Sequence, residues 1–343
     1  AAICNMTYGL TIKLVGENSI NSDNQPGILS VQSCGLLTLT GEGSLNITAA
    51  NGHAIYVNTG SLLVKDTTVK VSSNVLAVYA DLGIEISNST FESASTDGNA
   101  IWTPRDLTIE NSNVTTNSAG NFPAIWCDGD ITINGGQLKS TCAGGKALGA
   151  DGSLLVKDTT VKVSSDVLAV YANLGIEISG STFESSSTDS NAIWTPGDLK
   201  IENSNVTTNN AGKFPVIWSD RNITINGGQL KSTCTGNDAL GAAGTLSITD
   251  CTVENKGGSA LYSQGKMTLT GGSITADAEY NAIISNSAMT ITNATVKATA
   301  QRYNALRASD VMKIDGGRVE ATTVLHDDDV EPRFIPVMVY PEQ

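Results

Sequence analysis

The sequence predicts an all-β fold, a right-handed parallel β-helix solenoid of about fourteen coils, and three observations carry this prediction. Strand-like phrases return at a spacing of roughly 21 to 25 residues over most of the chain. Inside each phrase, hydrophobic residues alternate with polar ones, which is the period of a β-strand. Residues 61–152 recur as residues 153–244 with roughly four positions in five identical, which indicates a tandem duplication of four coils. A β-propeller or a stacked sandwich is the alternative, but propeller blades need about four strands in 40 or more residues.

Each coil is expected to contain three short strands joined by tight turns. In the first strand of one coil, Ile84 and Ile86 face one side and Glu85 faces the other. An Asn, Asp or Gly follows, such as Asn88, because these residues tolerate the left-handed turn before the second strand. A polar loop then leads to a third phrase such as "AIYV", "AVYA" or "AIWT". No coil can bury its apolar face alone, so the coils must stack into one continuous core.

The repeats also predict the domain organisation. Residues 1–320 are expected to form a single parallel β-helix domain, which includes the tandem duplicates 61–152 and 153–244. Residues 321–343, with the phrase "RFIPVMVYP", are predicted to cap the open end of the helix or to form a tail.

Composition and charge restrict the partners of the protein. Only 16% of the residues are charged, and the formal net charge is −14. Such a surface repels nucleic acid and anionic membranes, and no apolar run is long enough to span a bilayer. We therefore expect no nucleic-acid binding and no membrane insertion, but a monomeric protein that is extracellular or attached to a cell surface.

An aromatic residue recurs at one position of the third strand. The preceding aliphatic residue, Ile101 in one coil, is expected to face the core, so strict alternation places the aromatic residue outside. Equivalent positions in stacked coils lie about 4.8 Å apart, and the chain is therefore predicted to display a column of rings. The column contains Tyr56, Tyr79, Trp102, Trp126, Tyr171, Trp194, Trp218 and Tyr262.

Two interpretations of the column stay open. Exposed rings would offer a platform on which sugar rings stack, and neighbouring Asn, Thr, Asp and Lys side chains could bind the hydroxyl groups. Alternatively, the rings stabilise neighbouring strands, by about 0.5 to 1.5 kcal/mol for each pair.

Acidic residues follow the third strands and suggest calcium, although no cofactor is required by the pattern. Calcium prefers six to eight oxygen ligands, mostly carboxylates and carbonyls. The second copy has lost several of these charges, and turn formation alone accounts for Asp at corners. The weak metal candidates are Asp106, Asp128, Asp130 and Asp151.

The cysteines show no metal-binding spacing. Cys142 and Cys234 occupy the same position in the two copies, four coils apart, which is too far for a disulfide. We expect small buried thiols at these positions and at Cys127, and a Cys4–Cys34 disulfide is left open.

No catalytic residue is predicted. Glycoside hydrolysis needs a pair of carboxyl groups at a defined separation. Glu110 and Glu202, on the outer side of the first strands, are isolated from each other by four coils. A catalytic constellation is normally unique, whereas this sequence repeats its surface.

The phrases "LTIKLVGENSI", "GLLTLTGEGSLNIT", "MTLTGGSITA" and "MTITNATVKAT" resemble the carbohydrate-binding β-helix proteins of clostridial and other gut Gram-positive bacteria. The resemblance implies a bacterial surface protein with a pectate-lyase-like fold and a polysaccharide partner, such as a plant cell-wall or acidic glycan, with calcium in some members. The Gly-His-Gly phrase of pectate lyases and polygalacturonases is absent. We therefore expect a non-catalytic polysaccharide-binding or adhesion protein. The alternative is a structural spacer or protein-binding adhesin, and the third is a polysaccharide lyase or hydrolase.

Overall fold

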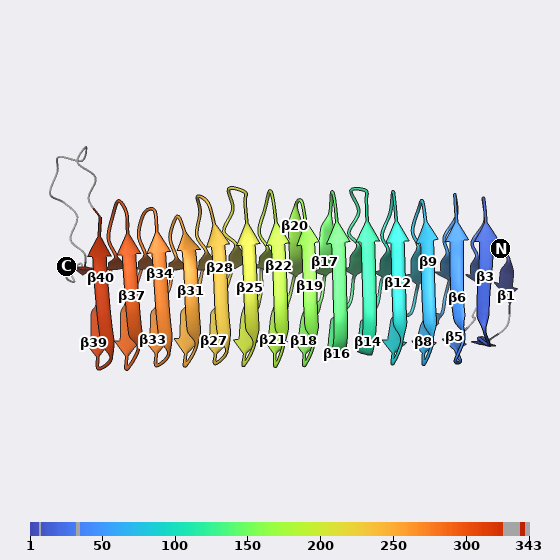
Figure 1. Cartoon of the computed structure of the whole chain (residues 1–343), viewed down its shortest axis with the longest axis horizontal. Helices are drawn as coiled ribbons and strands as arrows, with labels where there is room; N and C mark the ends of the chain where they lie inside the picture. The colour runs from blue at the N-terminus through green and yellow to red at the C-terminus, as the bar shows by residue number, and fades with distance from the viewer. Residues whose placement is uncertain (7, 32–34, 325–336, 340–343) are drawn as a thin grey trace. The chain divides into compact units, whose positions relative to one another are not determined.

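The computed structural model describes residues 1–6, 8–31, 35–324 and 337–339 (Figure 1). Within these ranges every regular element is a β-strand, and parallel strands stack as a β-solenoid of about 14 turns. The predicted all-β solenoid is thereby confirmed. The backbone divides into two compact units, Ala1–Asn173 and Leu174–Gln343. One domain over residues 1–320 stays a prediction.

Unit 1 (Ala1–Asn173) stacks its coils as three columns of strands, and every strand pairs in parallel with its equivalents in adjacent coils. Figure 1 shows the second strands side by side. The first strands are β2 (Gly9–Lys13), β5 (Leu36–Thr40), β8 (Ser61–Lys65), β11 (Ile84–Ser87) and β18 (Ser153–Lys157), and the second are β3 (Glu17–Ser22), β6 (Ser44–Ala49), β9 (Thr68–Ser73), β12 (Thr90–Ser95) and β19 (Thr160–Ser165). In two coils the first and second strands run together as one continuous strand, β14 (Leu107–Ser118) and β16 (Ile131–Cys142). The third strands are β1 (Ile3–Asn5), β4 (Ile28–Ser30), β7 (Ile55–Val57), β10 (Val78–Ala80), β13 (Ile101–Thr103), β15 (Ile125–Cys127), β17 (Lys146–Ala150) and β20 (Leu168–Ala172).

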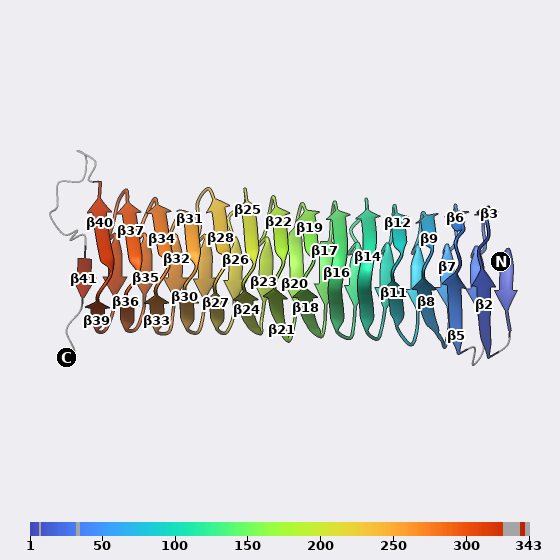
Figure 2. The ribbon, with the colours of Figure 1, turned by 60° about the horizontal axis from the view of Figure 1, so that its bottom comes forward.

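Unit 2 (Leu174–Gln343) repeats this plan. Figure 2 shows β32 and β35 of its third column lying side by side, and their residues pair in register. The first strands are β21 (Gly175–Ser179), β24 (Asp198–Glu202), β27 (Ile223–Asn226), β30 (Leu246–Thr249), β33 (Met267–Thr270), β36 (Met289–Thr292) and β39 (Met312–Asp315). The second are β22 (Thr182–Ser187), β25 (Asn205–Asn210), β28 (Gln229–Cys234), β31 (Thr252–Gly257), β34 (Ser273–Ala278), β37 (Thr295–Ala300) and β40 (Arg318–Thr323). The third are β23 (Ile193–Thr195), β26 (Ile217–Ser219), β29 (Leu240–Ala242), β32 (Leu261–Ser263), β35 (Ile283–Ser285), β38 (Leu306–Ala308) and β41 (Val337–Val339).

The expected cap at residues 321–343 is only partly described. β40 ends at Thr323, and β41 pairs in parallel with β38. The remainder of this segment lies outside the described residues. Within the described part of the chain, no helix is long and apolar enough to cross a membrane.

The turn between first and second strands has the left-handed conformation that the sequence predicts. Asp66, Asn88 and Asn111 have φ values of 52°, 48° and 46°, a region that Asn and Asp enter more readily than other side chains. The next residue points inward and bonds the adjacent coil: Ser112 Oγ accepts from the Ser89 amide at 3.0 Å. Each turn is thus tied to its neighbour, which keeps the coils in register.

The core is made of the same positions in coil after coil. Ile84 and Ile86 are buried, and in the next coil they pair with Leu107 and Ile109. The largest fully buried side chains include Phe91. Phe183, its equivalent in the second copy, is buried in the same way. The duplication therefore copied an entire core layer as well as a surface.

The cysteines behave as small core residues where they are described. Cys127, Cys142, Cys234 and Cys251 are buried free thiols, as expected for Cys127, Cys142 and Cys234. The Cys4–Cys34 disulfide lies outside the described residues, because Cys34 is not among them.

Candidate functional site

The third strands of unit 1 bring the predicted aromatic residues into one register. Tyr79 pairs with Tyr56 on one side and with Trp102 on the other, and Trp102 pairs with Trp126. Gly149 then separates Trp126 from Tyr171. We call these five aromatic residues the unit 1 aromatic column.

Four rings of the column are half-buried on the outer side of the sheet, whereas Tyr79 is buried with the core, which corrects the prediction that it is exposed. The residues before them, such as Ile55 and Ile101, have no exposed surface, which confirms the predicted alternation. Tyr56, Trp102, Trp126 and Tyr171 are half-buried, and Tyr79 is only 9% exposed. The rings are therefore covered in part by their neighbours, rather than displayed freely to solvent.

Stacking explains this cover at the N-terminal end of the column. The ring centroids of His53 and Tyr56 lie 4.8 Å apart, those of Tyr56 and Tyr79 5.0 Å, and those of Tyr79 and Trp102 4.9 Å. The Tyr79 hydroxyl donates to Asp81 Oδ1 at 3.1 Å. Burial, together with Asp81, raises the pKa of Tyr79 to about 12. The rings of His53, Tyr56 and Tyr79 are stacked face to face, whereas Trp102 is tilted by 49° against Tyr79. Both arrangements are favourable between aromatic rings, so this stretch stabilises the sheet.

The arrangement changes at Gly149, where the column has no side chain. A Cβ added there would lie 2.6 Å from Cζ3 and 2.7 Å from Cε3 of Trp126, so the indole leans over this glycine. The Trp126 ring is nearly parallel to that of Tyr171, at 12° and 6.2 Å between centroids. Trp126 Nε1 donates to Asp128 Oδ1 at 2.7 Å, which holds the indole in this orientation. We call this place the Gly149 opening.

The side chain of Lys146 lies over both rings that border the Gly149 opening. Its ammonium lies 4.9 Å from the Trp126 centroid and 5.1 Å from the Tyr171 centroid, as a cation–π contact with both rings. Burial lowers the pKa of Lys146, and the charge of Asp151 partly opposes that shift.

Unit 2 contains the remaining predicted aromatic residues and a second opening. Trp194 pairs with Trp218, Trp218 with Gly241, and Gly241 with Tyr262. These three aromatic residues are half-buried and form the unit 2 aromatic column. A Cβ at Gly241 would lie 2.5 Å from Cζ3 of Trp218, and Trp218 Nε1 donates to Asp220 Oδ1 at 2.7 Å. The Gly241 opening thus repeats the Trp–Gly–Tyr geometry of unit 1.

The four acidic metal candidates lie at successive corners and accept hydrogen bonds. Asp106 Oδ1 accepts from the Asp130 amide at 2.9 Å, and Asp130 Oδ1 accepts from the Ser153 amide at 2.7 Å. Asp128 holds the Trp126 indole, and Asp151 acts on Lys146 through its charge. Among the described residues no group of three or more His, Cys, Asp or Glu side chains could hold a metal ion. Calcium stays a prediction from the sequence.

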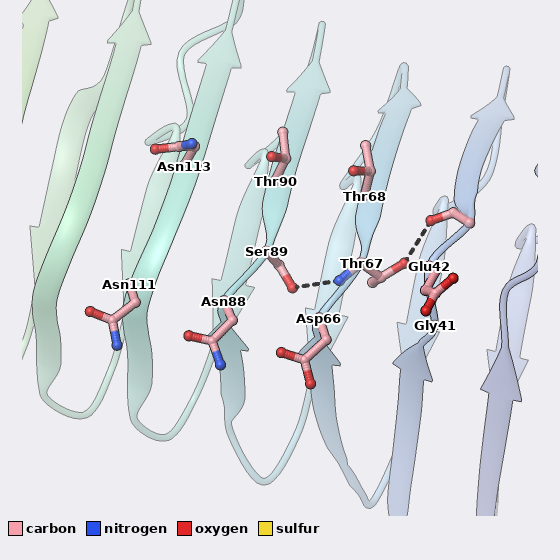
Figure 3. A pocket seen from close by; sticks show the side chains of 11 residues that line it. Gly41, Glu42, Asp66, Thr67, Thr68, Asn88, Ser89, Thr90, Asn111 and Asn113 are labelled. Atoms are coloured by element: carbon pink, nitrogen blue, oxygen red, sulfur yellow. Dashed lines mark hydrogen bonds between the residues drawn. The ribbon is translucent and has the colours of Figure 1, made fainter.

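A shallow polar groove of about 410 Å³ runs along the turns between the first and second strands of unit 1 (Figure 3). Asp66, Asn88 and Asn111 form one side, and Thr68 and Thr90 lie on the second strands beside them. The groove offers carboxylate, amide and hydroxyl groups at the strand spacing. It contains no aromatic side chain, and an apolar sugar face would find little to pack against.

Sequence reasoning missed several residues at these sites. Lys146 and its equivalent Asp238 were not singled out, nor was His53, which extends the ring stack. Phe122 and Phe214, equivalent in the two copies, are 54% and 53% exposed four residues before Trp126 and Trp218. A position-by-position comparison of the two copies would have revealed the exchange of Lys146 for Asp238.

The family comparison agrees with a sugar-binding surface. A family model described as carbohydrate-binding domain-containing protein matches residues 14–259 and 248–330. No curated protein and no solved structure matches the chain. The matched segments cover most of the solenoid, including both openings and every residue of the two aromatic columns. The chain belongs to the family of carbohydrate-binding domain-containing proteins.

Proposed function

We propose that this protein binds polysaccharide without cleaving it, and that the Gly149 and Gly241 openings of the aromatic columns make the central contact. The observation that carries the proposal is the repeated Trp–Gly–Tyr arrangement, in which an indole leans over a glycine and is held by an aspartate. The same geometry occurs in both units, at 2.6 Å and 2.5 Å from the added Cβ.

The glycines favour binding over a purely structural column. A ladder that only stabilised the sheet would gain from an aromatic residue in every coil, because each stacked pair contributes about 0.5 to 1.5 kcal/mol. Gly149 and Gly241 interrupt the ladder, and the indole of Trp126 or Trp218 fills the space over the glycine while it stays half-buried, with part of its surface exposed. The C–H face of a pyranose ring can pack there, while Asp128 or Asp220 offers its second carboxylate oxygen to a hydroxyl group.

The proposal includes an extracellular or cell-surface location, where such polymers occur. The net charge of −14 and the preponderance of uncharged polar residues support it. Fractionation of the native source, with detection of the chain in medium and cell-wall fractions, tests this location. Recovery in the cytosolic fraction alone would contradict it.

The experiment removes the two indoles and measures binding and stability together. Trp126→Ala and Trp218→Ala should each weaken pull-down on the insoluble polysaccharide bound by the wild type, by about 1 to 2 kcal/mol, as for aromatic hot spots. The double variant should lose more than either change alone, because two linked sites raise the avidity for a polymer. Leu174→Ala, which removes an exposed apolar side chain outside the columns, is the matched control.

A second candidate function is a structural spacer or protein-binding adhesin. The stack of His53, Tyr56, Tyr79 and Trp102 favours it, because those rings cover each other. Under this alternative the Trp126→Ala and Trp218→Ala variants would melt at lower temperature while their pull-down stayed at the wild-type level. That result would exclude the openings as the sugar contact.

A further inference from the structure

The chain contains three Asn–Gly dipeptides, which begin at Asn51, Asn134 and Asn226. An asparagine before glycine is prone to cyclise, because the glycine nitrogen can attack the side-chain amide carbon and no Cβ obstructs the attack. The reaction needs a backbone N–H that is free to move, so the surroundings of each dipeptide decide its reactivity. Asn134 and Asn226 are equivalent in the two copies, whereas Asn51 precedes the duplication.

Packing between coils protects Asn226. The Gly227 amide donates to the Thr249 carbonyl of the next coil at 2.9 Å, and the Asn226 carbonyl accepts from the Asn203 amide at 2.8 Å. A Cβ at Gly227 would lie 2.5 Å from Oδ1 of Asn203, so a neighbouring side chain closes over this glycine. Asn226 itself is half-buried, and Asn134 is half-buried at the same position of the first copy, inside β16.

Asn51 has different surroundings, in the loop between β6 and β7. Its side chain is exposed, and Nδ2 donates to Asn24 Oδ1 at 3.1 Å. Among the described residues no acceptor takes the N–H of Gly52. Glycine is required at this position, because a Cβ would lie 2.6 Å from the Gln25 carbonyl oxygen. The packing therefore requires a glycine after an exposed asparagine and leaves the N–H of that glycine unbonded.

We propose that Asn51 is a site of spontaneous deamidation, whereas Asn134 and Asn226 are protected. The Gly52 nitrogen attacks Asn51 Cγ and forms a cyclic succinimide, while the side-chain NH2 group and the Gly52 amide proton leave together as ammonia. Water then opens the ring at either of its carbonyl groups. The product is aspartate or isoaspartate, and isoaspartate places the side-chain methylene in the backbone.

Isoaspartate would lengthen the backbone between two fixed points. The Asn51 amide donates to the Asp23 carbonyl at 2.6 Å, and the Gly52 carbonyl accepts from Ser73 Oγ at 2.7 Å. An additional backbone atom between these bonds forces the loop to shift. The next residue is His53, whose ring stacks on the first ring of the unit 1 aromatic column at 4.8 Å between centroids. Deamidation should therefore loosen this end of the column.

The experiment compares the three dipeptides within one sample. The full chain is incubated in mildly alkaline buffer, folded or unfolded in guanidinium chloride, and peptide mass spectrometry follows the conversion of each asparagine to the acid. In the folded chain Asn51 should convert at least about tenfold faster than Asn226, because a hydrogen bond must open before Gly227 can react. Unfolding should make the three rates similar. Folded protein in which Asn51 stays intact, or in which Asn134 or Asn226 converts as fast, would overturn the inference.

Two variants separate the new charge from the lengthened backbone. Freshly purified Asn51→Asp carries the charge without the additional backbone atom. Asn51→Gln has a longer side chain that does not cyclise readily, and it should stay unmodified during the same incubation. The incubated wild type should melt at lower temperature than either variant. A wild type that contains isoaspartate but melts like Asn51→Asp would contradict the expected effect on the column.

Discussion

The neighbour in the adjacent coil decides what an aromatic residue does in this protein. Tyr79 lies between Tyr56 and Trp102, is 9% exposed, and ties its hydroxyl to Asp81. Trp126 has a glycine as its next neighbour and leans over it. Both residues obey the same alternation along the strand, yet one is a packing element and the other borders an opening.

A buried thiol gives a pH-dependent prediction at the same scale. Cys127 has no exposed surface, and burial raises its pKa from 9.0 to about 12. Only the thiolate reacts, so iodoacetamide at pH 8.5 should alkylate Cys127 in denatured protein but leave it intact in folded protein. Peptide mass spectrometry measures the modified fraction. Equal modification of folded and denatured samples would contradict the assigned burial.

The same shift affects stability. The Cys127 thiol has a pKa near 9 in the unfolded chain and about 12 in the folded protein. Its contribution to the free energy of unfolding is therefore complete only below about pH 9. Above that pH its contribution is lost progressively, because the unfolded thiol ionises first. Cys127→Ser, which gives unit 1 the residue found at Ser219 in unit 2, should remove this part of the pH dependence.

Each strand is held to the equivalent strand of the next coil by residues that recur at the same position in every coil. The left-handed turn residues, such as Asn88 and Asn111, let the chain turn between first and second strands. Aspartates that follow the third strands accept hydrogen bonds from the next coil. Asp106 accepts from the Asp130 amide, and Asp198 accepts from the Asn222 amide at 3.0 Å in unit 2. These carboxylates act as hydrogen-bond acceptors between coils.

This role predicts the effects of substitution and of metal removal. Asp106→Ala leaves the Asp130 amide without its acceptor and should lower the free energy of unfolding by about 0.5 to 1 kcal/mol. Asp106→Asn keeps an acceptor and serves as the control. Treatment with EDTA should leave the melting temperature of the wild type unchanged. A fall after EDTA that calcium reverses would instead support the calcium site suggested by the sequence.

At the scale of the whole molecule, the duplication repeats surface positions, and Glu110 recurs as Glu202. Glu110 has Ser87 and Asn134 as its neighbours in adjacent coils, and Glu202 has Ser179 and Asn226. Neither glutamate meets a second carboxylate in the register of its own column, and hydrolysis of a glycosidic bond needs a pair. The duplication multiplied these surface features, and a role without catalysis is what we propose for them.

Incubation with pectins, xylans and β-glucans should therefore release no reducing ends and no unsaturated products above background. Boiled protein gives the background, and a commercial pectate lyase is the positive control. Turnover that a single Asp or Glu substitution abolishes would contradict the prediction and support the lyase or hydrolase alternative.

The sequence by itself determined the solenoid, its strands and the register of its columns. The register of the strands is restricted by the period of two, the turn residue in each coil and the 92-residue duplication. A slip of one residue would turn Ile84 and Ile86 out of the core. The positions of all eight predicted aromatic residues on the outer side of the third strands followed from the same rule.

The tertiary structure alone decided how those side chains meet. The direction of a ring depends on the side chain in the next coil, which alternation within a strand does not specify. The cover of Tyr79, the tilt of Trp126 and Trp218 over Gly149 and Gly241, and the cation–π position of Lys146 are therefore visible only when the coils are stacked.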